Sequence, residues 1–201
     1  MSVEIIFDSS LIEQTLERLR EVPYALQRAV YPAISEVMDG VKDHLADYLT
    51  SDIPIDPKMA RKALKSQQPR VSGDFILGSV SVSSKMLPLI YYDAQPQSPT
   101  AQSGLRPQQW ADFTFSLRRG ERRAGRSRVQ GVSLPFIARM PNGHLGVYYR
   151  TTNQMKQAYG PTVQYHVTTP EVESAFNDRA NNRFPEILNR YADQALANFG
   201  G

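Results

Sequence analysis

The residues with the clearest chemical potential in this chain are six arginines within one short segment, 118–128. They are Arg118, Arg119, Arg122, Arg123, Arg126 and Arg128. A guanidinium group can bind a phosphate or a carboxylate through two parallel hydrogen bonds. Three roles follow: contact with a partner protein, contact with DNA, or a solvated connection. Flanking aromatic residues for base stacking are absent, and Gly120 and Gly125 favour a flexible loop.

The same segment contains the chain's nearest approach to a nucleotide-binding motif. Gly120 and Gly125 have the spacing of a P-loop, but Arg126 stands where that motif has lysine. Charged side chains fill the loop, and the sequence continues toward another strand instead of a helix. The segment is therefore not expected to cradle a nucleotide phosphate.

The histidines, serines and cysteines form no known catalytic pattern. His44, His144 and His166 have no ligand spacing with one another, and the chain has no cysteine. No Gly-x-Ser-x-Gly elbow is present. We therefore expect no enzymatic activity, no cofactor and no metal site. Isolated carboxylates can meet in space, so a small hydrolase with a diffuse site stays an alternative.

Charge and hydropathy limit the remaining classes of function. The net charge is +3, yet six arginines and Glu121 give the arginine segment +5, which leaves −2 for the rest. Coating of nucleic acid by the whole chain is therefore not expected. No apolar run reaches the roughly 20 residues that cross a bilayer. The N-terminus lacks a signal-peptide pattern, so we expect the chain to mature in a cytoplasm.

Apolar residues at helical spacing predict helices at both ends of the chain. The first is expected after the cap residues Asp8, Ser9 and Ser10, and the second follows Pro23 to about Leu49. A short basic helix is expected at about Lys58 to Ser66. The last should start at Thr168 and run to Phe199. Pro32 and Pro185 are expected to kink or break their helices.

Between the helices the apolar period changes to two, which predicts strands. The expected strands are 71–82, 87–92, 113–118, 132–140 and 145–151. We expect an α+β fold with one mostly antiparallel sheet of about five strands, flanked by N-terminal helices and a long C-terminal helix. The organisation should be a single domain, 1–201, with a helical part (1–66), a sheet core (70–165) and a final helix (168–199).

The stretch from Phe136 to Tyr165 predicts a hairpin and then a compact turn. Asn142-Gly143 is a strong hairpin signal because both residues tolerate positive φ. One face of the sheet is expected to carry Phe136, Ala138, Val147 and Tyr149. Tyr159-Gly160-Pro161 should stop a short helical turn.

The single tryptophan, Trp110, follows a loop rich in proline and glutamine, 94–109. Two roles are open for it. It could anchor this loop to the sheet, or it could contact another subunit, where tryptophan is often enriched.

The order of motifs in the sheet region, about 55–170, resembles the minor tail protein Z, or tail completion, family of long-tailed, lambda-like phages. The hairpin carries Phe136, Asn142, Gly143, His144, Gly146 and Arg150, followed by Tyr159, Gly160 and Pro161. Further landmarks are Arg61, Lys62, Leu64, Gly78, 87–92 and Gly131-Val132. The residues between the hairpin and Tyr159, 151–157, depart from the family's Ile-Arg-Glu-like phrase.

The resemblance implies a structural virion protein at the head-proximal end of a phage tail, in the neck region. Such a protein completes the tail tube and helps heads join tails, and it is assembled in the host cytoplasm. The implied partners are other copies in a ring, expected to be a hexamer, and the tail terminator, tail tube, head-completion and tape-measure proteins. The arginine segment could then face DNA in the channel. No membrane contact is implied, and a nucleic-acid-binding protein that uses the arginine segment is the alternative.

Overall fold

The computed structural model describes residues 2–7, 13–22, 24–72, 75–100, 112–125, 134–151 and 154–198. The chain divides into two compact units. Unit 1 consists of Met1–Ala46, Arg61–Ser83 and Val167–Gly201, and unit 2 consists of Asp47–Ala60 and Ser84–His166. These units do not coincide with the three consecutive parts expected from the sequence, and the single domain stays a prediction.

The predicted α+β class is confirmed, since the described residues form both helices and antiparallel strands. The helices are α1 (Glu13–Arg20), α2 (Ala25–Asp52), α3 (Pro57–Lys62), the 3-10 helix η2 (Leu89–Tyr91), α4 (Val163–Val167) and α5 (Pro170–Ala197). Pro32 and Pro185 lie inside α2 and α5, and neither breaks its helix. Thr169 caps α5 as expected, because its side chain accepts a hydrogen bond from the Val172 N–H.

The expected single sheet of about five strands is wrong, because the described strands form four small sheets. One sheet has the order β1-β4-β2 with β3 also on β4, and the others are β10-β9-β8, β11-β5 and β6-β7. Their bounds are β1 (Ser2–Ile6), β2 (Leu64–Ser66), β3 (Arg70–Ser72), β4 (Phe75–Val82), β5 (Met86–Pro88), β6 (Thr114–Phe115), β7 (Arg123–Ala124), β8 (Phe136–Arg139), β9 (Leu145–Arg150), β10 (Met155–Gln157) and β11 (Tyr159–Thr162).

Two of the expected elements end earlier than the sequence predicted. The strand expected at 87–92 ends at Pro88, which has no N–H for a longer ladder, and Leu89–Tyr91 turns into η2. The basic helix expected to reach Ser66 ends at Lys62. Leu64–Ser66 pairs with β4 instead, and Leu64 becomes buried there.

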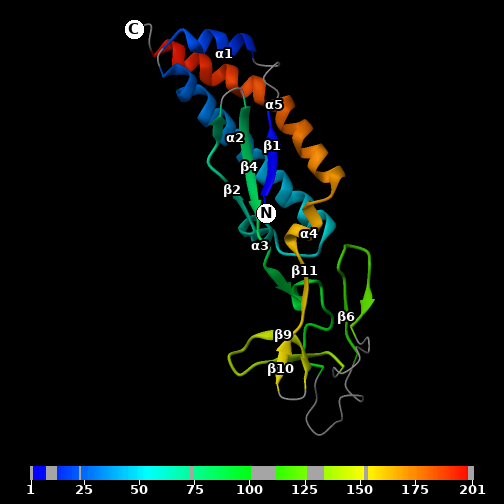
Figure 1. Ribbon diagram of the computed structural model, residues 1–201. Coiled ribbons are helices and arrows are strands. Elements are labelled where there is room, and N and C mark those ends of the chain that lie inside the picture. Colours follow the sequence, from blue (N-terminus) through cyan, green and yellow to red (C-terminus); the bar gives the residue numbers. More distant parts are fainter. Residues whose placement is uncertain are drawn as a thin grey trace. The chain divides into compact units, whose positions relative to one another are not determined.

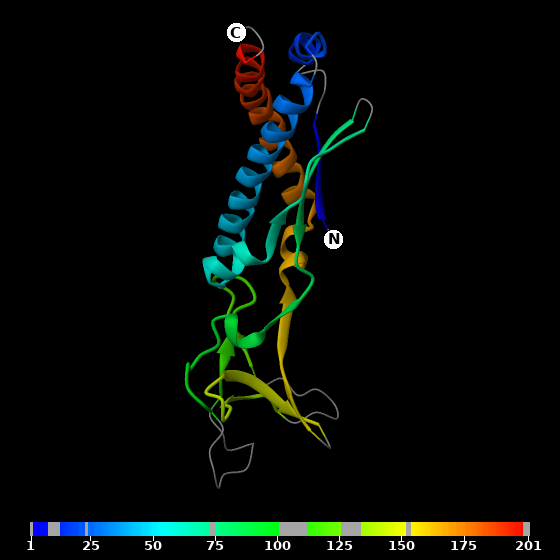
Figure 2. The ribbon, with the colours of Figure 1, turned by 90° about the vertical axis from the view of Figure 1, so that its left-hand side faces the viewer.

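Unit 1 packs its sheet against the long helices. Figures 1 and 2 show α2 and α5 side by side, with β1, β4 and β2 along them. The Phe7 and Phe184 rings lie 4.2 Å apart between centroids. A Cβ at Gly78 of β4 would lie 2.6 Å from the sulfur of Met38, so the glycine permits this close approach of α2. Residues from near both ends of the chain therefore contribute to the core of unit 1.

Unit 2 contains the predicted hairpin, but the faces of its strands differ from the expectation. Phe136 lies opposite Tyr148, whereas Val147 lies opposite Ile137. Phe136 and Tyr148 form one buried cluster, and Ile137 and Val147 belong to another with Ile90, Ala94 and Phe113. Phe136 and Val147 are therefore on opposite faces, because residues one position apart in register alternate between faces.

The Tyr159-Gly160-Pro161 phrase forms strand β11 and not the end of a helical turn. Tyr159 lies opposite Pro88 of β5. A Cβ at Gly160 would lie 2.4 Å from the ring of Tyr92, which is fully buried. The Tyr92 hydroxyl donates to the Pro161 carbonyl at 2.7 Å. Gly160 therefore allows β11 to lie against a rigid aromatic ring.

We predict that Gly160→Ala lowers the free energy of unfolding of unit 2 by about 1–3 kcal/mol, because the new methyl group overlaps the Tyr92 ring. Gly40→Ala is the matched control. Its Cβ would lie 3.7 Å from the nearest atom outside its helix, and we expect a gain of up to about 1 kcal/mol. Urea unfolding measures both changes, and equal stability of Gly160→Ala and the parent chain would contradict the contact.

Candidate functional site

The described part of the arginine segment, 118–125, belongs to a small antiparallel hairpin. Thr114 pairs with Ala124 and Phe115 with Arg123, so β6 and β7 flank the connection 116–122. A Cβ at Gly125 would lie 2.1 Å from the buried ring of Phe113, and the Gly125 N–H donates to the Phe113 carbonyl. The second glycine of the P-loop-like spacing therefore serves close packing in a hairpin.

Arg119 binds the C-terminal turn of α2. Its backbone N–H donates to the Asp52 carbonyl at 2.7 Å, and its Nε donates to the Thr50 carbonyl at 2.6 Å. The last carbonyls of a helix have no partner within the helix and carry partial negative charge. One arginine thus supplies two missing donors and a complementary charge.

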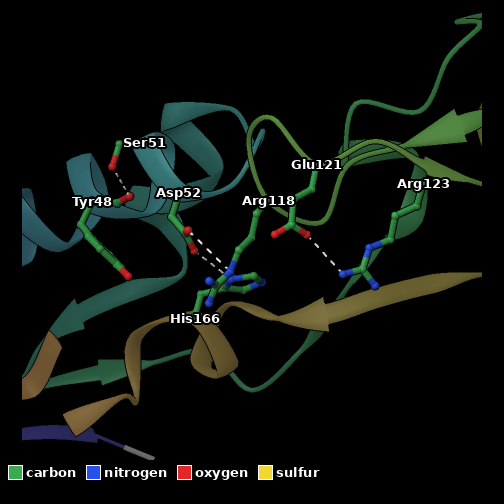
Figure 3. Close-up of polar contacts among 7 residues, drawn as sticks. All are labelled: Tyr48, Ser51, Asp52, Arg118, Glu121, Arg123 and His166. Atoms are coloured by element: carbon green, nitrogen blue, oxygen red, sulfur yellow. Dashed lines mark hydrogen bonds and ion pairs between the residues drawn. The ribbon is translucent and has the colours of Figure 1, made fainter. Parts of the chain in front are cut away.

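Asp52 at the end of α2 joins two further segments of unit 2. Its Oδ2 lies 3.1 Å from His166 Nδ1, and its Oδ1 lies 3.7 Å from Arg118 Nε. Figure 3 shows His166 and Arg118 approaching the same carboxylate. We call Thr50, Asp52, Arg118, Arg119 and His166 the helix-end cluster. It connects α2, the arginine segment and α4.

His166 is the buried member of the helix-end cluster, with 1% of its surface exposed. Burial lowers the pKa of His166, the bond to Asp52 opposes this effect, and the charge of Arg118 adds to it. With Asp52 ionised, Nδ1 must carry the proton of the shared hydrogen bond. Nε2 is buried with no hydrogen-bond partner, so a second proton there would have no acceptor.

The other two described arginines of the segment also contact this chain. Arg122 donates to Asp93 at 2.8 Å and to the Thr114 hydroxyl at 3.0 Å. Arg123 pairs with Glu121 at 3.2 Å, and both side chains are more than half exposed. All four described arginines therefore have partners within unit 2. A phosphate or a carboxylate of another protein would have to compete with these contacts.

The remaining candidate residues divide into two groups. Trp110, Arg126 and Arg128 lie outside the described residues, as do Gly131, Val132 and the expected cap at Ser9 and Ser10. The hairpin residues form a scaffold. Asn142 Oδ1 accepts from the His144 N–H, Gly143 has a φ of +82°, and the Arg150 guanidinium lies 6.0 Å from the centroid of the Phe136 ring. The predicted Asn-Gly turn is thus observed.

The described residues show no sign of a metal site or a membrane span. Among them, no three His, Asp or Glu side chains gather closely enough to hold a metal ion. No helix in the described part of the chain is long and apolar enough to cross a membrane. No family model, curated protein or solved structure matches the chain.

Sequence reasoning did not identify Thr50, Asp52 or His166 as site residues. Asp52 and His166 are 114 positions apart, and His166 was not linked to any carboxylate. One local signal was present. Asp52 precedes Ile53-Pro54, where a helix is expected to end, and exposed carbonyls at such an end attract cations.

We predict that Arg119→Ala lowers the free energy of unfolding of unit 2 by about 0.5–1 kcal/mol, because the Thr50 carbonyl loses its side-chain donor. Arg123→Ala removes an exposed pair with a near neighbour in sequence and should cost less than about 0.5 kcal/mol. Urea unfolding compares the two variants. A larger loss for Arg123→Ala than for Arg119→Ala would argue against the capping role.

We also predict a pH dependence from His166. Since its pKa is lowered in the folded state, the unfolded chain binds this proton more readily, and stability is lost as the pH falls below about 6.5. His166→Gln keeps a possible donor to Asp52 but does not titrate. Hydrogen exchange of unit 2 at about pH 7.5 and about pH 5 should show a larger loss of protection in the parent chain than in the variant. Equal losses would contradict this assignment.

Proposed function

We propose that this chain is a structural protein of a phage virion, acting at the head-proximal end of the tail. In this role it completes the tail tube and helps heads join tails, as a ring of several copies, six being expected. The proposal rests on the resemblance to the minor tail protein Z family. The resemblance covers about residues 55–170, and the hairpin with the Tyr159-Gly160-Pro161 phrase is its most specific part.

One structural observation supports using these residues together as a family signature. The hairpin, the 87–92 landmark and the Tyr159-Gly160-Pro161 phrase are neighbours in unit 2, whereas Arg61, Lys62, Leu64 and Gly78 belong to unit 1. The Leu89 N–H donates to the Ala158 carbonyl, and the Ala158 N–H donates to the Val147 carbonyl. Gly160 and Pro161 contact Tyr92 from the 87–92 landmark. These three segments of the resemblance thus build one packed element.

The polar contacts of the helix-end cluster are consistent with a structural role. Arg118, Arg119 and His166 hold the chain to itself, through the end of α2. Such a unit presents a fixed surface to neighbours. The proposed neighbours are the tail terminator, tail tube, head-completion and tape-measure proteins.

The nucleic-acid-binding alternative gains no support from the described arginines. Arg118 and Arg122 are paired with Asp52 and Asp93, so part of the local positive charge is already neutralised. The alternative would be favoured if the isolated chain bound DNA with an affinity that falls steeply as the salt concentration rises. The slope of that fall reports the number of counterions that the protein releases from the DNA.

The decisive test is genetic. Deleting the gene from the parent phage should leave heads and tails that fail to join, because the head-proximal tip of the tail is incomplete. Negative-stain images of purified tails should then differ from complete tails at that tip only. Complementation with the parent chain should restore joining. Normal infectious particles without the protein would refute the proposal.

A further inference from the structure

The tip of the β8–β9 hairpin places an exposed asparagine directly before an exposed glycine. Asn142 and Gly143 form the only Asn-Gly pair in the sequence. Gly143 has a φ of +82°, and a Cβ built on it would meet no atom within 4 Å beyond its chain neighbours. Because glycine has no side chain, its backbone nitrogen is open to close approach.

The side-chain amide of Asn142 is folded over the backbone of this turn. Its Oδ1 accepts the His144 N–H at 3.0 Å. The ring of atoms that this hydrogen bond closes contains both the Asn142 Cγ and the Gly143 nitrogen. A donor on Oδ1 also stabilises the negative charge that develops on this oxygen when a nucleophile adds to Cγ. The hydrogen bond therefore holds the Asn142 amide over the Gly143 nitrogen and activates it as an electrophile.

One contact opposes an attack by the Gly143 nitrogen. Its N–H donates to the Met140 carbonyl at 2.8 Å, and this bond must be released first. The bond lies at an exposed hairpin tip, where Pro141, Asn142 and Gly143 are all exposed. Exposed turns open locally at a much lower free energy than the whole fold. The reaction therefore needs an opening of the tip and no unfolding of unit 2.

We propose that Asn142 is a site of spontaneous covalent modification, deamidation through a cyclic imide. The Gly143 nitrogen bonds to the Asn142 Cγ and gives its proton to solvent, and the side-chain nitrogen takes up a proton and leaves as ammonia. Water then opens the five-membered imide at either carbonyl, which leaves aspartate or isoaspartate in place of Asn142. The net reaction consumes one water and releases one ammonia, with no oxidation or reduction.

The two products have different effects on the hairpin. Aspartate keeps the path of the main chain, and its carboxylate can still accept the His144 N–H. Isoaspartate routes the main chain through Cβ and so adds one atom to the turn. The length of the turn sets the register that pairs Arg139 with Leu145. Isoaspartate should therefore loosen the tip of the hairpin, whereas aspartate should leave it closed. This modification does not depend on the virion role, because it rests only on the contacts of the turn.

The test incubates the folded full chain in mildly alkaline buffer and follows each asparagine by peptide mass spectrometry, with enzymatic methylation to identify isoaspartate. Asn142 should convert at least about tenfold faster than the asparagines of α5, because a helix holds the two reacting atoms out of position. Asn177 and Asn181 are the internal controls. Their side-chain nitrogens donate to the Glu173 and Asn177 carbonyls at 3.0 Å and 3.1 Å.

The variant Asn142→Ser assigns the signal to this residue. Serine can also accept the N–H of the residue two positions on, so the turn keeps an acceptor for His144, but it has no amide to lose. We expect no isoaspartate in the hairpin of this variant. Circular dichroism shows whether the variant is folded, and the comparison with α5 within the parent chain stands without it.

Three results would overturn the proposal. The first is an Asn142 that stays intact in the folded chain; conversion of a synthetic peptide of residues 139–145 would then show that the turn protects it. The second is conversion of Asn142 no faster than that of the asparagines in α5. The third is formation of aspartate with no isoaspartate, which would indicate direct hydrolysis by water and no imide.

Discussion

The free carbonyls at the C-terminal end of α2 are the constraint on which unit 2 depends. A helix end exposes carbonyls and negative partial charge, and a chain must supply donors for them. Arg119 meets this need with its backbone and its side chain, and Asp52 in the same turn holds Arg118 and His166. The segments that contain Arg119 and His166 lie more than 60 positions further along the sequence than the end of α2, and these contacts hold both of them there. Through Arg118 and Arg119, the described part of the arginine segment, 118–125, binds the end of α2.

Sequence patterns predicted the elements whose stability is local. The long helices follow apolar spacing and caps such as Thr169, and the Asn142-Gly143 turn follows from its tolerance of positive φ. The faces of the β8–β9 hairpin were not predicted correctly, because they depend on the length of the turn. The pairing of Arg139 with Leu145 sets Phe136 opposite Tyr148, and a shift of one residue would have reversed every face.

The candidate site was less predictable than the fold, for a physical reason. A cluster such as Asp52, Arg118 and His166 is created by tertiary packing, and no local spacing records it. Short strands such as β2 and β11 likewise depend on partners far away in sequence, so Leu64 and Tyr159 were assigned to helical turns. The six arginines are conspicuous as a group in the sequence, yet the partners of the four described ones, Arg118, Arg119, Arg122 and Arg123, become visible only in three dimensions.

The contacts of the helix-end cluster hold unit 2 in one conformation. A unit held in this way offers fixed surfaces to neighbouring proteins, which is what the proposed virion role requires. Cryo-electron microscopy of mature particles of the parent phage tests this most directly. We expect density for several copies of this chain in a ring at the head-proximal end of the tail, with Asp52 bound to Arg118 and His166 in each copy. Particles that lack the chain, or that hold it elsewhere, would refute the proposed role.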